Sequence, residues 1–285
     1  MKEEIIELNI KDIIDFPNHP FKIIDDSNYE ELRNSIIESG ILVPAIVRRL
    51  DNGKFEMLSG HRRKKICEEQ GIKRIPCIVK SLSNQEAIIL MVDSNLQRDK
   101  ILPSEKAMAY KMKYDVLKEQ GKTLFPSGTS SELNDTKTQV YRYIRLNNLI
   151  PELLQLVDDT VLKDKRSALT MGLRPAVELS YLDKEDQELV YDEISYEDLT
   201  PSHVQAKRIR ELGEKGKLNI EALEEIFLEP KPNQIKRISF NEEKLRRVLP
   251  KDIKDYKIEA YVLNAVENYS KMLAIERGDD YDLEI

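Results

Sequence analysis

A glycine followed by a run of cations forms a pattern that is typical of phosphate binding. The stretch is Gly60-His-Arg-Arg-Lys64, and it follows a segment that contains Phe55, Met57 and Leu58. This order predicts a strand that ends at Ser59, a turn at Gly60 and a helix that begins with Arg62, Arg63 and Lys64 in its first turn. Helix N-termini offer unpaired N–H groups and partial positive charge, and arginines add donors for phosphate oxygens. An exposed basic helix start explains these residues equally well on their own.

A second polar group lies at the end of the helix predicted for residues 84–95. Asp93 and Asn95 carry oxygens that suit magnesium, and Arg98 carries a guanidinium that suits a phosphate. The alternative is an ordinary helix end with a capping asparagine and a solvated arginine. His19 lies with Lys22 in a loop that contains prolines, and this lone histidine is interpreted as polar surface.

The helix predicted for residues 136–147 has the composition of a DNA recognition helix. Its apolar side is formed by Val140, Ile144 and Leu146. Residues 133–136 are predicted as the turn of a helix–turn–helix, with Thr136 as the helix cap. Cations, an amide and a tyrosine on the other side suit a major groove, although a plain solvated helix has the same pattern. The predicted DNA contacts are Lys137, Thr138, Gln139, Arg142, Tyr143 and Arg145.

The elements that position these residues change character near residue 100. Before it, periodicity predicts a compact α/β domain, and after it the strand signals stop. The predicted strands are 5–10, 41–49, 54–59, 74–80 and 235–240. The predicted helices are 28–39, 61–70, 84–95, 105–120, 136–147, 151–157, 175–182, 184–194, 201–212, 220–227 and 258–275. The predicted domains are therefore 1–99, 100–228 and 229–285, the last beginning with a proline-containing linker.

The composition indicates a globular protein of the cytosol. The chain has 285 residues, of which 34% are charged and 40% hydrophobic, with a net charge of −7. No apolar run reaches the length of a membrane span, and no signal peptide is apparent at the start. Cys67 and Cys77 have neither disulfide nor metal-type spacing and are expected to be buried hydrophobes. We find no nucleophile–base set and no Walker-type loop.

Five stretches in a fixed order resemble one known family. They are Gly40-Ile-Leu-Val-Pro44 with Val47-Arg48, Gly60-His-Arg-Arg63, Ser94-Asn-Leu-Gln-Arg-Asp99, Pro103-Ser-Glu-Lys-Ala-Met-Ala-Tyr110 and Arg142-Tyr-Ile-Arg-Leu146. The set resembles the ParB family of plasmid and chromosome partition proteins over roughly residues 5–215. The variants present look most like ParB-like proteins carried by mobile elements of low-GC Gram-positive bacteria.

The resemblance implies a fold and a mechanism. The fold is α+β, with a ParB/sulfiredoxin-like α/β N-domain, an all-α helix–turn–helix domain and a small α/β C-terminal segment that dimerises. The N-domain would bind CTP with Mg²⁺ and close two chains into a clamp on double-stranded DNA at a centromere-like site. A ParA-type ATPase is the expected partner of the N-terminus, and the expected place is the nucleoid in the cytoplasm. The matched nucleotide contacts are Gly60, His61, Arg62, Arg63, Asn95 and Arg98, with Asn95 near the metal.

Several positions depart from the family pattern. His61 and Ser94 stand where the family usually has glutamate, and Phe21 stands where it often has arginine. These changes predict weak or absent CTP hydrolysis, while CTP binding is expected to persist. Two alternatives are a transcription or conjugation regulator of a mobile element that uses the same modules, and a nuclease of the ParB fold. A sulfiredoxin-like enzyme is not expected, because the arginine box, Gly60-His-Arg-Arg63, contains no cysteine.

Overall fold

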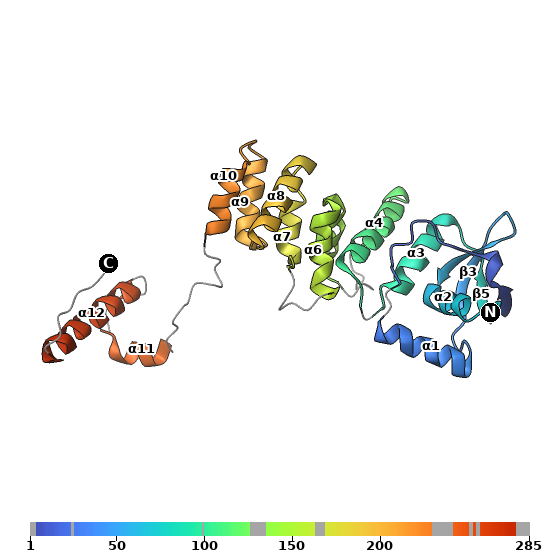
Figure 1. Ribbon diagram of the computed structural model, residues 1–285, viewed down its shortest axis with the longest axis horizontal. Coiled ribbons are helices and arrows are strands. Elements are labelled where there is room, and N and C mark those ends of the chain that lie inside the picture. The colour runs from blue at the N-terminus through green and yellow to red at the C-terminus, as the bar shows by residue number, and fades with distance from the viewer. Residues whose placement is uncertain are drawn as a thin grey trace. The chain divides into compact units, whose positions relative to one another are not determined.

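The computed structural model describes most of the chain and divides it into two units, Met1–Pro230 and Lys231–Ile285. The described residues are 4–23, 26–98, 100–125, 135–162, 169–229, 242–250, 253–254 and 257–277. Figure 1 traces the first unit from its sheet through a series of helices.

The first unit opens with a five-stranded sheet of order β1-β5-β3-β4-β2. Its strands are β1 (Ile5–Asn9), β2 (Ile13–Asp15), β3 (Ala45–Arg49), β4 (Phe55–Ser59) and β5 (Arg74–Lys80). The pairs β1–β5 and β3–β4 are antiparallel, whereas β3–β5 and β2–β4 are parallel. The tight turn between β3 and β4 uses Gly53 at a φ of 79°. The short strand β2 was not predicted from the sequence.

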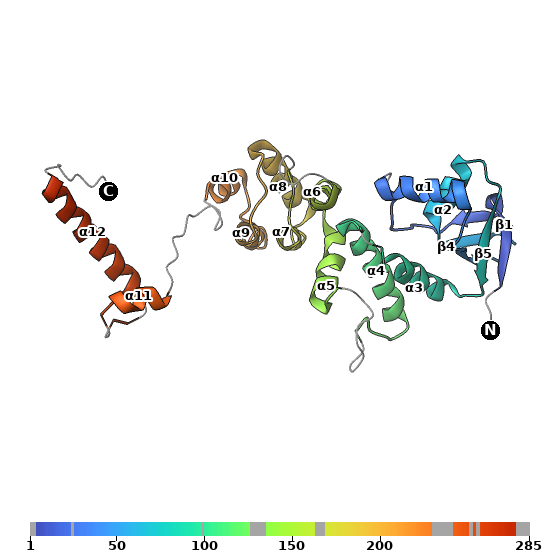
Figure 2. The same ribbon diagram turned by 90° about the horizontal axis from the view of Figure 1, so that it is seen from below.

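Helices cover both faces of this sheet. They are α1 (Ser27–Ser39), α2 (His61–Glu69) and α3 (Asn84–Asn95). Alternate strand residues point to opposite faces, so Val47 and Met57 pack in one cluster with residues of α1 and α2. Leu58 packs in another cluster with residues of α3. Figure 2 shows α1 and α2 together on one side of the strands. The end of β4 thus delivers the chain directly to the start of α2.

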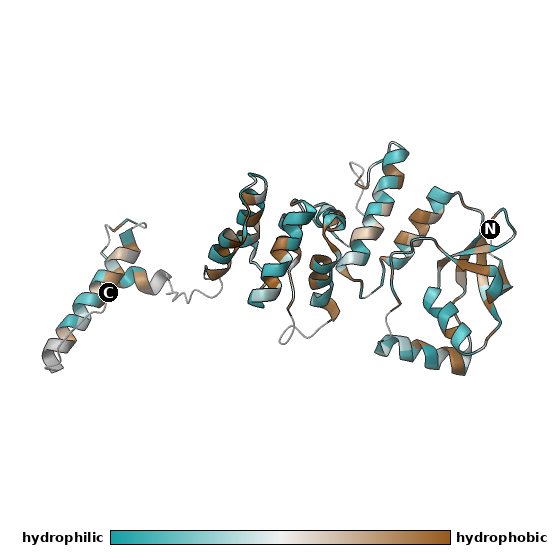
Figure 3. Cartoon of the chain, turned by 45° about the horizontal axis from the view of Figure 1, so that its top comes forward, coloured by the Kyte–Doolittle hydropathy of each residue, from teal (hydrophilic) through white to brown (hydrophobic). Residues whose placement is uncertain are grey.

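Seven helices complete the first unit as the structure describes it. They are α4 (Pro103–Glu119), α5 (Lys137–Arg145), α6 (Pro151–Leu162), α7 (Leu173–Leu179), α8 (Lys184–Glu197), α9 (His203–Gly213) and α10 (Ile220–Leu228). Apolar residues gather on the strands and on the facing sides of the helices (Figure 3). Helix α4 joins the two regions, because Ala109 and Tyr110 pack with α3 while Ala107 packs with the later helices. The predicted boundary between residues 99 and 100 therefore lies beside a hydrophobic cluster that α4 shares with the sheet domain.

The second unit has two described helices, α11 (Glu242–Val248) and α12 (Ile258–Arg277). Helix α11 was not predicted, and the predicted strand at 235–240 lies outside the described residues. The first half of the predicted helix–turn–helix turn, residues 133–134, also falls outside them. The α+β class is confirmed by the sheet and the helices that follow it. In the part of the chain that the structure describes, no helix combines the length and apolar character needed to cross a membrane.

Candidate functional site

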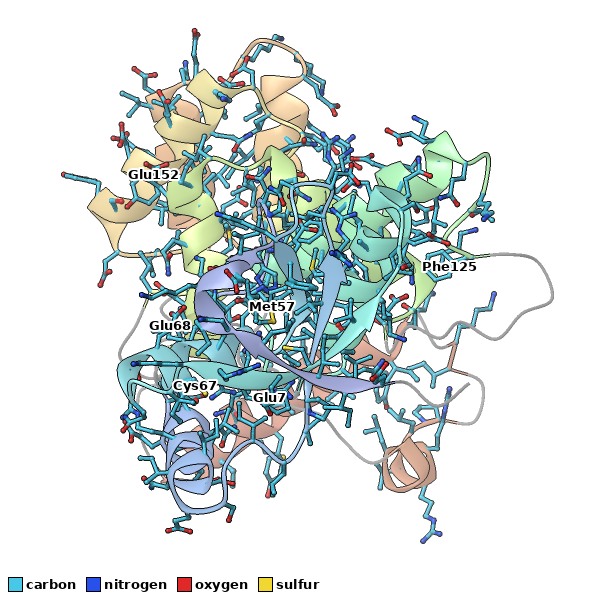
Figure 4. All side chains as sticks on the ribbon, turned by 90° about the vertical axis from the view of Figure 1, so that its right-hand side faces the viewer. Glu7, Met57, Cys67, Glu68, Phe125 and Glu152 are labelled. Atoms are coloured by element: carbon cyan, nitrogen blue, oxygen red, sulfur yellow. The ribbon has the colours of Figure 1, made fainter. Side chains whose placement is uncertain are left out.

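The turn at Gly60 is built for a residue without a side chain. Gly60 has a φ of 111°, which strains any other residue. A Cβ added there would lie 3.0 Å from Cβ of Ala45, on the neighbouring strand. Figure 4 labels Met57 on β4 and Cys67 on α2, the two elements that this turn joins. Glycine therefore allows α2 to begin in close contact with Ala45 at the start of β3.

The first turn of α2 is open to a ligand. No side chain caps this helix among the described residues. The first intrahelical bond is donated by Lys64 N–H to the Gly60 carbonyl at 3.0 Å, so the preceding N–H groups have no partner within the helix. These N–H groups and the helix dipole together favour an anion.

Two neighbouring cavities meet at this helix start. The first has a volume of about 220 Å³, and its polar lining includes His19, Gly60, His61, Arg63, Ser94 and Asn95. The second has a volume of about 380 Å³, and its lining includes Asp26, Asn28, Gln97, Lys100, Val161 and Leu162. Arg62 and Arg98 line both cavities. The structure therefore brings together all six residues predicted to contact the nucleotide.

The Arg62 and Arg98 guanidiniums both line this space, and of the two only Arg62 has a carboxylate partner among the described residues. Arg62 lies 3.2 Å from Asp26, and its guanidinium stacks 5.4 Å from the ring centre of Tyr29. No carboxylate of the described residues forms an ion pair with Arg98. Burial lowers the pKa of Arg98; the charge of Glu105 raises it, and the charge of Arg62 lowers it. An anion placed between these two cations would relieve their repulsion.

The other two cations of the box have partners within the chain. Arg63 donates from Nη1 to the carbonyls of Val43 and Pro44, the latter at 3.0 Å, and so fastens the loop before β3. Lys64 is mostly buried and lies 2.7 Å from Asp15. The interpretation of Lys64 as part of the phosphate cradle is therefore wrong, since its ammonium group is already paired.

Two histidines stack inside the first cavity. The ring centres of His19 and His61 lie 3.8 Å apart, with the ring planes 40° from parallel. His19 Nδ1 lies 2.9 Å from the Phe21 carbonyl, while His19 Nε2 and both ring nitrogens of His61 are buried without a partner among the described residues. Burial, followed by the neighbouring His19, lowers the pKa of His61 to about 3. The interpretation of His19 as polar surface is wrong, because its ring lines the cavity.

The groups predicted to bind magnesium do not assemble into a metal site. Asp93 lies 2.6 Å from Lys113 of α4, so its carboxylate serves as an interhelical ion pair. Asn95 is buried and donates from Nδ2 to the Met91 carbonyl at 2.8 Å. No group of three or more histidine, cysteine or acidic side chains among the described residues could hold a metal ion. One amide oxygen at Asn95 does not make a magnesium site, and that predicted role stays a prediction.

The predicted recognition helix presents only part of its polar face. Thr136 caps α5, and Gln139 bonds back to Thr136 N at 2.9 Å, so Gln139 is used in the cap. Lys137 and Thr138 are exposed, and Arg142 is partly exposed. The exposed position predicted for Tyr143 is wrong. Its ring packs against two hydrophobic clusters of the first unit, the one that contains α3 and the one that contains the later helices, and lies 5.0 Å from Lys106 Nζ.

Arg145 is held by the helices that follow α5. It donates from Nη2 to the Ser180 carbonyl at 2.9 Å and from Nε to the Ser180 hydroxyl at 3.2 Å. Its guanidinium also stacks 3.9 Å from the ring centre of Tyr181. The guanidinium of Arg210 lies 3.7 Å from the same ring centre. The Arg145 guanidinium is thus already engaged within the chain.

Sequence reasoning missed Asp26, Tyr29 and Lys100 as parts of the site. Asp26 could be recognised as the cap of α1, because its side chain accepts from Tyr29 N at 2.9 Å in the expected manner. Its approach to Arg62 joins positions 36 residues apart and has no local signal.

Comparisons with known proteins agree with this order of elements. The ParB N-terminal domain family matches residues 1–96. The chromosome-partitioning protein Spo0J of Thermus thermophilus is 30% identical over 206 residues, which cover 72% of this chain and 71% of that protein. The chain belongs to the ParB family.

Other ParB-family relatives match a shorter stretch. The nucleoid occlusion protein of a Geobacillus species is 37% identical over 109 residues, covering 38% of this chain and 39% of that protein. The chain thus spans well under half the length of the nucleoid occlusion proteins that it matches.

A truncated Caulobacter crescentus ParB complexed to the centromeric parS site aligns with a TM-score of 0.43 and 19% identity, covering 74% of this chain and 99% of that one.

Proposed function

We propose that this ParB-family chain is a DNA-binding partition protein of the cytoplasm and nucleoid whose N-domain binds a nucleoside triphosphate, CTP by preference. The observation that carries this proposal is the pair Arg62 and Arg98, which line both cavities at the uncapped start of α2. Family membership supports the choice of CTP and of a clamp that closes around DNA.

The chemistry of the cleft favours a phosphate chain over a neutral ligand. Open N–H groups, two guanidiniums and the glycine turn all offer positive charge or close backbone approach. Together, the two adjoining cavities of about 220 and 380 Å³ reach the size range of small-molecule sites. A triphosphate at Arg62 and Arg98 leaves the second cavity, with Asn28 and Leu102, for the rest of the nucleotide.

Magnesium does not fit a protein-held site here, because Asp93 is paired and the described acids do not cluster. The chain's own residues bind and orient the phosphates: Arg62 and Arg98 supply charge, and Gly60 lets the N–H groups of α2 approach. Nucleotide binding is the proposed activity of this site, and hydrolysis is not part of the proposal.

We propose that α5 contacts double-stranded DNA through its exposed side, with Lys137, Thr138 and Arg142 as the contacts that the chain leaves available. Cations contribute to DNA affinity mainly through phosphates, while arginine can also read guanine in the major groove. The target would be a palindromic centromere-like site, because we propose a homodimer joined through the second unit. A ParA-type ATPase is the proposed further partner.

Two enzyme classes are less well supported. The Cys67 and Cys77 thiols are buried, and burial raises the pKa of Cys77 to about 11, so neither offers the thiolate that a sulfiredoxin-like reaction requires. A nuclease of this fold would cleave DNA that lacks a centromere-like site, in the presence of magnesium. Incubation of the chain with such duplex DNA and magnesium tests this alternative.

The test of nucleotide binding compares CTP, ATP and GTP on the full chain by calorimetry. We expect CTP to bind most tightly, and Arg62→Ala or Arg98→Ala to weaken it by about tenfold or more, since a charged hydrogen bond contributes about 1.5–3 kcal/mol. Arg49→Ala is the matched control, because Arg49 is exposed at the end of β3 away from Ala45. Equal affinity for the three nucleotides, or equal effects of all three variants, would contradict the proposal.

A further inference from the structure

The stacked imidazoles of His19 and His61 face the proposed phosphate site with nitrogens that lack partners. His61 is the first residue of α2, so its ring stands at the helix end that offers open N–H groups. His61 Nδ1, His61 Nε2 and His19 Nε2 are buried and unpartnered among the described residues. Buried polar atoms normally have a hydrogen-bond partner, so three in one cavity point to a ligand.

The hydrogen bond of His19 fixes what it can offer that ligand. A carbonyl oxygen only accepts, so the 2.9 Å contact with the Phe21 carbonyl requires a proton on His19 Nδ1. A neutral His19 therefore presents a bare lone pair at Nε2. A phosphate oxygen is also only an acceptor when ionised, and the two would repel. Protonation of Nε2 turns this acceptor into a charged donor.

We propose that binding of a phosphate-bearing nucleotide is coupled to the uptake of one proton by the His19–His61 pair. This inference rests on the proposed function, because it concerns the same site. One proton is expected for the pair, since two charged rings with centres 3.8 Å apart would repel each other. The proton is taken from solvent and rests on an imidazole nitrogen, which then donates to a phosphate oxygen.

The charged groups around the pair explain why the proton is absent without a ligand. Asp15 favours a charged His61, whereas Lys64 and Arg98 oppose it. Arg62 adds positive charge to the same cavity, and Asp15 is itself paired with Lys64. Burial lowers the pKa of both histidines. A phosphate chain adds negative charge beside the pair and so reverses this balance.

The first experiment measures proton uptake by the full chain on binding CTP. Calorimetry at pH 7.5, in two buffers with different ionisation enthalpies, is carried out on the wild type and on His19→Gln/His61→Gln. Glutamine donates an N–H without needing a proton, so the double variant retains a donor and loses the titration. We expect uptake of about one proton by the wild type and of almost none by the variant. The wild-type Kd should rise up to about tenfold per pH unit above the bound-state pKa.

The second experiment uses only the wild-type chain, so it remains valid if the double variant does not fold. The chain has 3 histidines, and His203, half exposed on α9, is an internal reference. We expect CTP to move the carbon-bound ring proton signals of His19 or His61 to imidazolium positions at pH 7, with His203 unchanged. Equal uptake by wild type and variant, or rings that stay neutral with CTP bound, would overturn the inference and leave nucleotide binding intact. Absence of CTP binding between pH 6 and 8 would overturn the proposed function as well.

Discussion

At the scale of single residues, Gly60 controls how closely α2 approaches the sheet. We predict that Gly60→Ala lowers both the free energy of unfolding and the affinity for CTP. A left-handed backbone costs a residue with a Cβ about 1–2 kcal/mol. The new Cβ would also press on Ala45 at 3.0 Å and move the open N–H groups. Urea unfolding and calorimetry with CTP measure the two losses.

Gly53→Ala is the control for this substitution. Gly53 also has a positive φ, of 79°, but a Cβ there would meet nothing within 4 Å. It should show the backbone cost alone and leave the affinity for CTP unchanged. If the two variants lose the same stability and affinity, the close approach at Ala45 has no role.

His61 also predicts how stability depends on pH without a nucleotide. Its pKa is lowered to about 3 in the folded chain, against 6.5 as the ordinary value. Between these values the unfolded chain binds a proton that the folded chain does not, so stability falls as pH drops below about 6.5. The limiting slope for one group is about 1.4 kcal/mol per pH unit. Urea unfolding at several pH values should show a steeper loss for the wild type than for His61→Gln, and parallel curves would refute this.

Single residues were predictable as far as their local pattern reached. The succession of strand, turn and helix in the sequence predicts the positions of Gly60, Arg62 and Arg63, and the next helix predicts that of Asn95. The structure brings these residues to one cavity. The partners that remove Lys64 and Asp93 from the site lie on β2 and α4. Such pairings depend on how distant elements pack, and spacing along the chain carries no signal for them.

At the scale of elements, α5 is anchored by one arginine and presents another. We predict that Arg145→Ala lowers the free energy of unfolding by about 1–3 kcal/mol, because it removes bonds to Ser180 and leaves the Ser180 carbonyl without its donor. Arg142→Ala, three residues away on the same helix, should change stability by less than about 0.5 kcal/mol. For DNA binding, Arg142→Ala should have the larger effect of the two variants. It should weaken binding to every duplex if Arg142 contacts phosphates, and at one base position if Arg142 contacts a base.

Thermal unfolding and DNA titrations at two salt concentrations separate these two roles. Loss of a phosphate contact reduces the salt dependence of binding by about one counterion. A stable, fully DNA-binding Arg142→Ala protein would remove α5 from the proposed interface. A destabilised Arg142→Ala with an unaffected Arg145→Ala would show that the anchor has been assigned to the wrong arginine.

Elements with strong periodicity were predicted well, and those defined by packing were not. Helices α1, α2 and α3 begin and end within a few residues of their predicted bounds. The strand β2 has 3 residues and exists because it pairs with β4, which its own pattern does not reveal. Tyr143 was misplaced because α5 packs on two sides, against α4 and α7, so a single inward face was the wrong assumption.

At the scale of the whole molecule, the second unit carries an apolar groove that none of its described residues fills. The groove, of about 320 Å³, is lined by Leu245, Val248, Leu249, Tyr261, Val262, Ala265, Val266 and Tyr269. Val248 is 78% exposed and Val266 is 58% exposed. Residues 262, 266 and 269 recur at helical spacing and form one face of α12. Such a face supports the proposed homodimer, because helices usually bury an apolar stripe against a partner.

We predict that the full chain, of 33.1 kDa, sediments as a dimer at micromolar concentration, and that Val266→Asp shifts it to monomer. Burying an unpaired carboxylate in the groove costs several kcal/mol, which weakens the dimer by about a hundredfold or more. Asn264→Asp is the matched control, because it adds the same charge about 160° around α12 from Val266. If a palindromic site is read by two α5 helices, the monomeric variant should also lose specific DNA binding while CTP binding persists, because the nucleotide residues all lie in the first unit. A Val266→Asp protein that remains dimeric would place the dimer contact elsewhere in the chain.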